Sequence, residues 1–450
     1  MAKEKKMNML EGSIMDKLLL FALPLAASSI LQQLFNSADV AVAGKFAGPD
    51  ALAAVGGNSA VINLLVNLFV GLSIGANVVI ANYIGQKKPD QAKESVHTTV
   101  ALSMICGLIL MVIGLFSARF ILELIDTPAE TLDAAVLYLR IYFLGMPFIM
   151  FYNFSAAILR SVGDTKRPLY CLIVSGIVNV LLNLFFVIVC RIDVAGVALA
   201  TVLSNVISAG MILYYLMHAE DTIRFEPARL KLHGDQVLKI MRIGIPAGLQ
   251  GIVFSFSNVC IQSGINSLGK HAVAGSAAAL NYEYFTYFVT NAFAQAVVTF
   301  TSQNYAAKEY GRCKRIFRQC MLLGLVITAM MSIIFVGANQ FFMEIYTSDA
   351  EAIRFGIIRL THVELLECMT CLYEISGGAL RGMGYSLLPS LMTVFGCCVV
   401  RLIWLYTVFK QYHTFAALMT VYPFSWVVTT ILVLGAYYIV RGHLFRRNAS

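Results

Sequence analysis

The amino-acid sequence predicts an all-α integral membrane protein of about twelve transmembrane helices, arranged as two pseudo-symmetric six-helix lobes around a central cleft. Of its 450 residues, 59% are hydrophobic and 13% are charged, whereas soluble proteins carry about 25% charged residues. Long uncharged segments recur along the whole chain, and the second half repeats features of the first. A chain of this composition has lipid rather than water as its main solvent.

Each predicted span is close to the roughly 20 residues of helix that cross a hydrocarbon core. The apolar segments are long and do not alternate with polar residues, so they indicate helices rather than the strands of a barrel. The first six predicted spans are 15–44, 53–83, 95–117, 134–159, 168–190 and 194–217. The second six are 236–266, 272–301, 316–340, 352–380, 388–409 and 415–440.

Lysine and arginine are unevenly divided between the connections of these spans. Both terminal segments and one set of connections hold most of the 33 basic residues, including Lys87, Lys166 and Arg312. The N-terminal bases of this set are Lys3, Lys5, Lys6 and Lys17. Because basic connections stay in the cytoplasm, we expect a multi-pass protein of the cell (inner) membrane with both termini cytoplasmic. The net charge of +8 therefore indicates topology, and without a nucleic-acid-binding motif we expect no nucleic-acid partner.

The ten cysteines predict no disulfide framework, because most lie within apolar spans and Cys368 and Cys371 fall in the middle of one. We interpret them as packing residues. Residues 1–16 are polar and lead directly into a long span, so we expect no cleavable signal peptide.

An internal repeat divides the chain. The matching positions are Leu159, Arg160, Gly163 and Pro168 in the first half and Leu380, Arg381, Gly384 and Pro389 in the second. The offset between Arg160 and Arg381 is 221 residues, and Asn36 meets Asn258 at an offset of 222. Six spans separate corresponding points, so both halves insert in the same orientation. We predict an N-terminal lobe over 1–217, a cytoplasmic linker over 218–235 and a C-terminal lobe over 236–450.

Asp39 is a carboxylate placed inside the first span. Such a residue costs about 3 kcal/mol on insertion scales, so it persists mainly where it faces a cavity, a partner or an ion. Gln32, Asn36 and Asp39 share one helical face. This stripe predicts a cation site at Asp39 and Asn36, with a substrate contact at Gln32. The alternative is an aspartate near the outer interface that caps or hydrogen-bonds a neighbouring helix.

Two amides and a hydroxyl follow on the fifth and sixth spans. Asn179 and Asn183 stand four residues apart, and Thr201 lies on the next span. Taken without Asp39, they are typical of hydrogen-bonding groups between helices; with Asp39, they supply the oxygens that a hard cation prefers. Their counterparts in the second half, with that of Asp39, are Ile261, Val400, Trp404 and Tyr422. None of these is a carboxylate or an amide, so we expect cation binding in the first half only.

The second half has acids of its own inside predicted spans. Glu364 and Glu367 fall on one face of the tenth span, and Glu283 lies in the eighth beside Tyr284. Carboxylates among aromatic rings suit a lipophilic cation, so we predict that these four residues bind substrate. The alternative is that Glu364 pairs with a base such as Arg401 and that the tyrosines only pack.

These motifs resemble those of one family. The repeated Leu-Arg motif, the span that ends in Asn36-Ser-Ala-Asp39 and the Ile84-Gly-Gln-Lys turn resemble multidrug and toxic compound extrusion (MATE) transporters. The resemblance covers nearly the whole chain. It implies twelve helices in two lobes, export of organic cations in exchange for inward sodium or protons, and a cation site at the first-half residues Asp39, Asn179, Asn183 and Thr201.

The sequence departs from the family at two places. Some members carry a second carboxylate where Asn183 stands here, so the single charge of Asp39 leaves the choice between sodium and protons open. Others place a glutamate in the seventh helix, where this chain has Phe254, Ser255 and Phe256. An acidic site of the second half would therefore lie elsewhere.

We therefore predict a secondary active antiporter that exports small organic cations by alternating access. We expect a monomer in the lipid bilayer with no cofactor, and sodium or protons as the coupling ion. The rival interpretation is a lipid-linked oligosaccharide flippase of the same superfamily, whose cleft would carry many bases, whereas Arg401 is the main base within a span here. An intramembrane enzyme is less favoured, because the chain lacks a His-Glu-x-x-His or P-loop motif.

Overall fold

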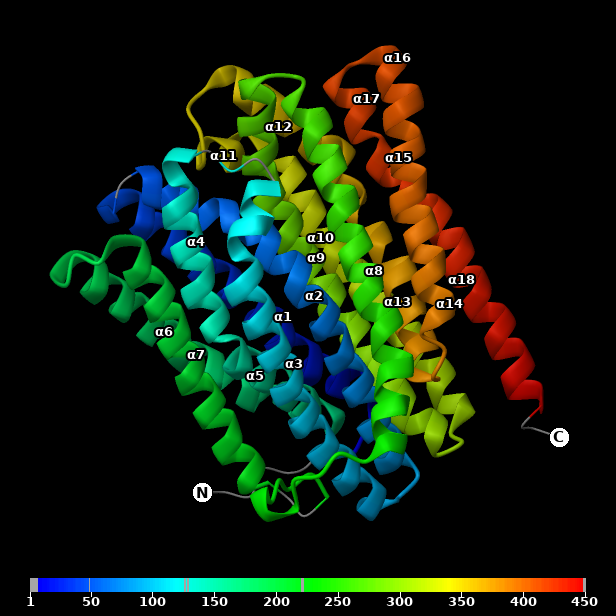
Figure 1. The fold of residues 1–450 in the computed structure, drawn as a ribbon. Helices are drawn as coiled ribbons and strands as arrows, with labels where there is room; N and C mark the ends of the chain where they lie inside the picture. Colours follow the sequence, from blue (N-terminus) through cyan, green and yellow to red (C-terminus); the bar gives the residue numbers. More distant parts are fainter. Residues whose placement is uncertain (1–6, 48, 125–126, 128, 220–221, 448–450) are drawn as a thin grey trace. The chain divides into compact units, whose positions relative to one another are not determined.

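A computed structural model describes residues 7–47, 49–124, 127, 129–219 and 222–447, whose elements are helices joined by short turns (Figure 1). The chain forms two compact units. The first contains residue 7 and residues 27–248, and the second contains residues 8–26 and 249–447. The predicted lobe boundaries rest on the repeat and stay a prediction, since the second unit also includes the N-terminal segment. Lys3, Lys5 and Lys6 lie outside the described residues.

The first unit is built from most of the first six predicted spans and the beginning of the seventh. They are the end of α1 (Ile14–Val42), the π-helical turn Ala43–Ala47, α2 (Pro49–Gly85), α3 (Pro89–Leu124), α4 (Ala129–Leu144), α5 (Met146–Ser161), α6 (Lys166–Leu184), the π-helical turn Phe185–Val189, α7 (Asp193–Met217), the short 3-10 turn Pro227–Arg229 and the beginning of α8 (Gly234–Asn266). Here α3 packs against α2, α4 and α5, while α7 packs against α4, α5 and α6.

The second unit follows from the remaining spans. Its elements are the beginning of α1, the end of α8, α9 (Lys270–Ala306), α10 (Tyr310–Gly337), α11 (Asn339–Glu344), α12 (Ala350–His362), the 3-10 turn Glu364–Met369, α13 (Thr370–Gly382), α14 (Leu387–Thr393), the π-helical turn Val394–Val399, α15 (Val400–Trp404), the π-helical turn Leu405–Phe409, α16 (Lys410–Tyr412), α17 (Phe415–Met419) and α18 (Val421–Arg447). α9 packs against α10, α12 and α13, and α13 packs in turn against α18.

Nine helices of the described chain are long and apolar enough to cross a bilayer, and the bent pair of α4 and α5 makes ten. That pair is the fourth predicted span, which the structure divides in two with a bend of 48°. The break falls at Gly145, and Pro147 stands in the first turn of α5. Proline lacks the N–H that would continue a helix, so a bend at this place is expected.

The eighth and tenth predicted spans are helical but do not pass this test of length and apolarity. The eighth is α9, which carries Glu283, and the tenth is interrupted between α12 and α13 by the 3-10 turn that holds Glu364 and Glu367. The polar residues of the second half therefore lie where its helices depart most from a plain apolar span.

The repeated Leu-Arg motif ends two helices with the same turn. After α5, Gly163 has a φ of 90°, and its N–H donates to the carbonyl oxygen of Arg160 at 2.9 Å. After α13, Gly384 has a φ of 92° and donates to the carbonyl oxygen of Arg381, also at 2.9 Å. Glycine adopts this left-handed conformation without a steric penalty. The sequence repeat thus corresponds to one local structure used twice.

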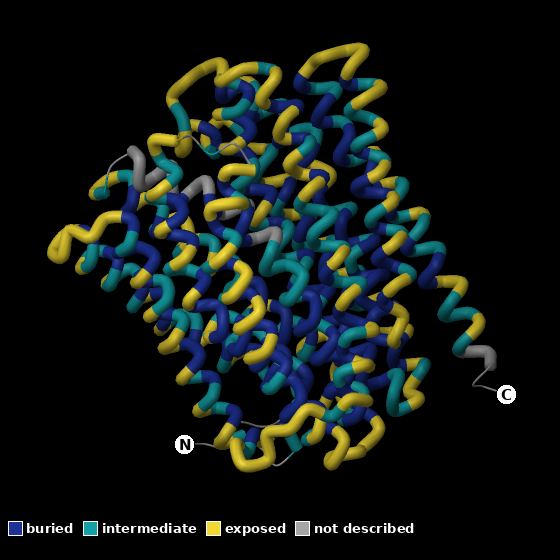
Figure 2. Tube along the Cα trace, viewed as in Figure 1, coloured by how far each residue is buried: buried dark blue, intermediate teal, exposed yellow. Residues whose placement is uncertain are grey.

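Exposed apolar side chains recur along the helices of both units. Figure 2 shows exposed positions along helices as well as on the turns between them. Phe116 of α3 is 81% exposed and Ile333 of α10 is 63% exposed. Water would make such a surface an aggregation site, whereas lipid tails are as apolar as these side chains.

The N-terminal segment of the second unit is held by Arg312. Its Nε donates to the carbonyl oxygen of Met9 at 3.1 Å, and its Nη atoms donate to those of Gly12 and Glu11, each at 3.0 Å. Asn304 also donates to the carbonyl oxygen of Met9, at 3.2 Å. Arg312 is therefore a buried residue that holds the backbone of residues 9–12 in place, and it is not an exposed base.

Helices α2 and α8 approach each other within the first unit at glycines spaced four residues apart. These are Gly71 and Gly75 on α2 and Gly244 and Gly248 on α8. A Cβ atom at Gly248 would lie 2.3 Å from the carbonyl oxygen of Leu68, which is backbone and cannot turn away. Small residues at this spacing let membrane helices pack backbone against backbone.

We expect Gly248→Ala to destabilise the protein by about 1–3 kcal/mol, because the added methyl group forces the two backbones apart. Melting temperatures of the detergent-solubilised protein would measure the loss. The control is Gly210→Ala on α7, where an added Cβ meets nothing within 4 Å and alanine is the better helix former. Equal melting temperatures for both variants would contradict the close packing.

Candidate functional site

Three helices of the first unit bring four of the five predicted cation ligands together. Asp39 lies near the end of α1 and is 7% exposed. Asn179 and Asn183 are one turn apart on α6, so both amides lie on the same side of that helix. Thr201 lies on α7, which packs against α6. The sequence pattern thus corresponds to a real cluster in space.

Hydrogen bonds join the four side chains. Asn183 Nδ2 donates to Asp39 Oδ1 at 2.5 Å and lies 3.3 Å from Asn179 Oδ1. Thr201 Oγ1 donates to Asp39 Oδ2 at 3.4 Å, and Asn179 Nδ2 donates to Thr201 Oγ1 at 3.5 Å. Because hydrogen bonds of this kind are usually shorter than 3.2 Å, the cluster is loosest on its Thr201 side.

The cluster holds one carboxylate and no base. Within the described chain, no lysine, arginine or histidine nitrogen lies within 4.0 Å of the Asp39 carboxylate. The Oδ1 atom of Asn183 is buried and has no hydrogen-bond partner among the described residues. A buried oxygen without a partner calls for an explanation, and carboxylate, amide and hydroxyl oxygens together form a donor set for a hard cation.

Gln32 and Asn36, the other members of the predicted stripe, are exposed on α1. No hydrogen bond joins either of them to Asp39 in the part of the chain that the structure describes. Asn36 lies about one helical turn before Asp39, and Gln32 lies about two turns before it. Their predicted contacts with a cation and a substrate therefore stay predictions, separate from the buried cluster.

Glu283 forms an ion pair that the sequence analysis did not predict. Arg359 of α12 donates from Nε to Glu283 Oε1 at 2.6 Å and from Nη2 to Oε2 at 2.7 Å. Its Nη1 donates to the hydroxyl of Ser276 at 2.6 Å. Both charged side chains are buried, with Arg359 2% and Glu283 6% exposed. The signal was available, since Arg359 lies inside the tenth predicted span.

Glu364 does not pair with Arg401 in the described chain, so that part of the alternative is wrong. Its Oε1 accepts a hydrogen bond from Thr286 at 2.6 Å, and its Oε2 is buried without a partner among the described residues. Arg401 donates instead to Ser425 and to Asn258, at 3.1 and 3.2 Å. The helices place these groups apart, although sequence spacing alone allowed the pair.

A cavity of about 150 Å³ lies in the second unit. Its lining includes three predicted substrate residues, two buried arginines and a further tyrosine, namely Glu283, Tyr284, Glu367, Arg359, Arg401 and Tyr422. Glu364 is not among the lining residues. The cavity therefore collects acids, bases and aromatic rings, with one acid already neutralised by Arg359.

The counterparts of the cation ligands have other roles in the second unit. Trp404 Nε1 donates to the carbonyl oxygen of Ala417 at 2.9 Å, and Ile261 is buried. The ring of Tyr422 lies under the guanidinium of Arg401, 4.5 Å from its centre. Where the first unit has an acid without a base, the second has a base over an aromatic ring.

One segment of α2 matches a pattern typical of nucleophilic enzymes, Gly71-Leu-Ser73-Ile-Gly75. In such enzymes the serine stands on a tight turn between a strand and a helix. Ser73 instead lies inside a long helix, is buried, and donates to the carbonyl oxygen of Val70 at 2.7 Å. The two glycines serve helix packing, so the match carries no catalytic role.

The fold and these buried polar groups define an integral membrane transporter. The chain belongs to the MatE family, whose sequence model matches residues 24–185 and again residues 246–407. Members of this family are MATE transporters and not enzymes. The two matches also agree with the internal repeat.

Relatives of known name cover nearly the whole chain. It is 26% identical over 444 residues to the probable multidrug resistance protein YoeA of Bacillus subtilis (strain 168), covering 95% of this chain and 94% of YoeA. It is 26% identical to the probable multidrug resistance protein NorM of Thermotoga maritima, covering 86% and 84%. The flippase alternative is not favoured, because these relatives are named for multidrug resistance.

Solved structures have the same fold. A crystal structure of MATE in complex with MaL6 has a TM-score of 0.91, with 20% identity, and covers 99% of this chain and 100% of that one. An outward-facing MATE family transporter has a TM-score of 0.90 with 21% identity, covering 98% and 100%. The predicted fold class is therefore confirmed: an all-α membrane transporter with the twelve-helix, two-lobe layout of MATE structures.

Proposed function

We propose that the protein is a secondary active antiporter that exports organic cations in exchange for inward sodium ions or protons bound at the Asp39 cluster. The observation that carries this proposal is the buried Asp39 carboxylate, which has amide and hydroxyl neighbours and no base in the described chain. An acid of this kind inside a membrane span marks an ion or proton pathway by default. Drug export is supported by the names of the relatives, which are given as probable multidrug resistance proteins.

Coupling requires that the bound ion favour one conformation over another. A cation at Asp39 would compete with the hydrogen bond that Asn183 donates to the same carboxylate. The partnerless Oδ1 of Asn183 could then turn toward the ion. Since Asp39 and Asn183 stand on α1 and α6, exchanging one contact for the other changes how these helices are held together.

The charge of the proposed substrate follows from the acid in the cavity that has no base paired with it. Glu283 is neutralised by Arg359, so Glu367, with Tyr284 nearby in the cavity lining, is the acid left to attract a lipophilic cation. One elementary charge crossing about 100 mV is worth about 2.3 kcal/mol. A one-for-one exchange of monovalent cations moves no net charge, so the chemical gradient of the coupling ion supplies the work. A single chain completes this cycle.

Ethidium efflux from proteoliposomes tests the proposal. We expect an imposed sodium gradient or an imposed proton gradient to speed efflux, and the effective gradient identifies the coupling ion. A membrane potential set with valinomycin should add little, because a one-for-one exchange is electroneutral. An efflux rate that neither gradient changes would overturn the antiport proposal. Transport of anionic lipid-linked sugars alone would overturn it as well.

The proposed orientation places both termini in the cytoplasm. Arg312 is buried, so Arg315 is the better probe of its connection. We expect cysteines placed at Lys87, Lys166 and Arg315 to react with an impermeant maleimide only from inside, and those at Lys45, Lys270 and Lys410 only from outside. The background should replace the native cysteines that are not buried, Cys190, Cys260 and Cys368. The reverse labelling pattern would contradict the proposed orientation.

A further inference from the structure

Arg401 of α15 is a buried base that forms no direct ion pair among the described residues. It is 1% exposed, and its guanidinium lies over the rings of Tyr422 and Phe254, 4.5 and 5.4 Å from their centres. Its Nε and Nη1 donate to the neutral oxygens of Ser425 and Asn258. Among the described residues, no carboxylate oxygen lies within 4.0 Å of it.

A buried charge of this kind is strongly disfavoured unless something compensates it. The aromatic faces stabilise a cation in part, and the two neutral acceptors satisfy some of its N–H groups. Neither carries a negative charge, and Glu367, which lines the same cavity, has no carboxylate oxygen within 4.0 Å of Arg401. Arg359, in the same unit, shows the contrast, because the carboxylate of Glu283 meets it with two hydrogen bonds. Arg401 is therefore the base left for an anionic ligand.

The surroundings of Arg401 indicate what else that ligand carries. Arg401 lines the cavity of about 150 Å³ together with aromatic residues, among them Tyr287, Tyr373 and Trp426. A cavity of that size holds a benzene ring. A guanidinium binds a carboxylate through two parallel hydrogen bonds. The geometry fits a single aromatic ring that carries a carboxylate.

We propose that this cavity binds the aryl carboxylate group of a small organic molecule, with the carboxylate held by Arg401. A molecule that also carries an amine can place it toward Glu367, whose carboxylate accepts no hydrogen bond in the described chain. The site lies in the second unit and takes a group of opposite charge to the proposed coupling ion. It therefore goes beyond the proposed antiport and does not depend on the coupling ion.

Ligand-observed NMR on the purified, detergent-solubilised full chain tests the site with phenylacetate and its neutral isostere phenylacetamide. We expect phenylacetate to bind about tenfold more tightly to the wild type, the scale of a charge-assisted hydrogen bond. Arg401→Gln should abolish this preference, and Arg401→Lys should retain most of it. The control is Arg167→Gln, which removes another guanidinium over a tyrosine ring, 5.5 Å from the centre of Tyr215 in the first unit.

Equal affinity of the wild type for acid and amide would overturn the proposal, and this comparison needs no variant to fold. A preference that survives in a folded Arg401→Gln protein would overturn it as well. Asp39→Asn should keep the preference for the acid. Failure of the carboxylate site and failure of the antiport proposal are therefore distinguishable, since binding is measured without any ion gradient.

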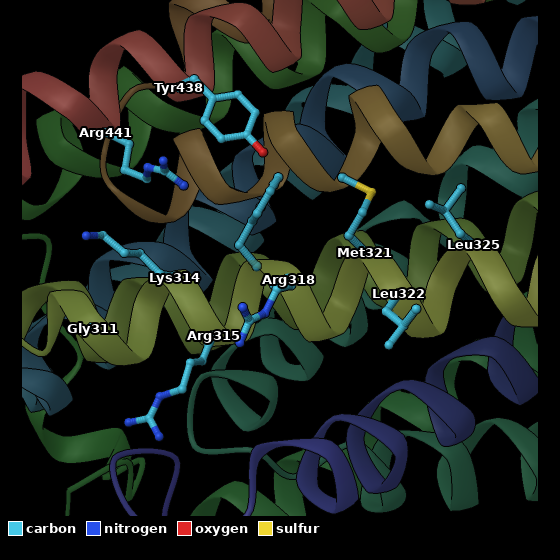
Figure 3. Close-up of a pocket in the computed structure, with 10 residues that line it drawn as sticks. Gly311, Lys314, Arg315, Arg318, Met321, Leu322, Leu325, Tyr438 and Arg441 are labelled. Carbon is cyan, nitrogen blue, oxygen red and sulfur yellow. The ribbon is translucent and has the colours of Figure 1, made fainter.

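A larger cavity, of about 610 Å³, lies between α10 and α18 of the second unit and carries an independent inference. Figure 3 shows Lys314, Arg315, Arg318 and Arg441 gathered at one end, whereas Leu322 and Leu325 follow along α10 toward the other. Leu322 is 54% exposed. In the described chain, no carboxylate pairs with Arg315, Arg318 or Arg441 within 4.0 Å.

This arrangement matches the two chemical parts of a phospholipid. Basic groups near the ends of membrane helices attract anionic headgroups, and the apolar side chains further along α10 suit an acyl chain. Orienting the protein in the membrane requires only that basic residues lie in a cytoplasmic connection. It does not require that bases of α10 and α18 line one cavity together. We infer that the cavity between α10 and α18 binds an anionic phospholipid.

Native mass spectrometry and melting curves of the delipidated full chain test this inference with phosphatidylglycerol, phosphatidylcholine and inorganic phosphate. We expect retention and stabilisation by phosphatidylglycerol alone, and loss of both in the triple variant Arg315→Gln, Arg318→Gln, Arg441→Gln. Arg119→Gln is the control, because Arg119 is exposed but already paired with Glu123 at 2.9 Å. Equal stabilisation by phosphate or phosphatidylcholine, or an unaltered triple variant, would overturn it.

Discussion

Asp39→Asn is expected to lower gradient-driven efflux by more than about a hundredfold while the protein still folds. Groups that only support a bound metal are worth 10–100-fold in affinity, and Asp39 supplies the single charge of the proposed site. Asparagine keeps the size of the side chain and one acceptor oxygen, which can accept a hydrogen bond from Asn183 or from Thr201. A neutral amide is also easier to place inside the membrane than a carboxylate, so the variant should reach the membrane in normal amount.

Ethidium efflux from proteoliposomes under the same gradient measures the effect. Asn179→Ala and Thr201→Ala should reduce ion dependence less, because each removes one neutral ligand. Ser37→Ala is the control on the same helix, since Ser37 is exposed and its hydroxyl donates to the carbonyl oxygen of Gln33, at 2.9 Å. If Asp39→Asn exported dye as fast as its parent, Asp39 would be a structural residue and the proposed ion site would be wrong.

Helix positions were largely predictable because long apolar segments leave few other structures open to a chain in lipid. The predictions failed where local chemistry breaks a span. The fourth span divides at Gly145, and the tenth contains the 3-10 turn with Glu364 and Glu367. Hydropathy averages over about twenty residues, so it reports that a segment crosses the membrane but not where its helix bends.

Contacts along one helix were also predictable, because residues four apart share a face. Asn179 and Asn183 were paired on that ground, and they do lie together on α6. Contacts between helices depend on which faces meet, and spacing in the sequence does not specify this. Glu364 was therefore matched with the wrong partner, and the ion pair of Glu283 with Arg359 was missed.

The symmetry of the repeat is likewise only partly a guide to chemistry. It reproduces the glycine turns after α5 and α13 with φ values of 90° and 92°. At the positions that matter for binding, however, the described parts of the two halves differ in charge: no base lies within 4.0 Å of the Asp39 carboxylate in the first unit, and no carboxylate oxygen lies within 4.0 Å of Arg401 in the second, although Glu367 lines the same cavity as Arg401. Backbone structure is thus repeated while the side chains at the two sites are opposite.

Glu283→Gln is expected to destabilise the protein by about 3–5 kcal/mol, because it leaves the buried guanidinium of Arg359 without a counter-charge. The wild-type pair has two short hydrogen bonds, of 2.6 and 2.7 Å, and both side chains are buried. Arg359 would keep its bond to Ser276, but a hydroxyl cannot neutralise it. Thermal unfolding in detergent and the amount of folded protein recovered from membranes would measure the loss.

The double variant Glu283→Gln with Arg359→Met shows whether the single change destabilises the protein through an uncompensated charge or through altered packing. Removing both charges from a buried pair is often neutral or stabilising, so the double variant should regain most of the stability lost by Glu283→Gln alone. If it stays as unstable as the single variant, the loss comes from packing around α9 rather than from an uncompensated charge. If Glu283→Gln is itself as stable as the wild type, the ion pair contributes nothing to the fold, and Glu283 returns as a candidate for substrate binding.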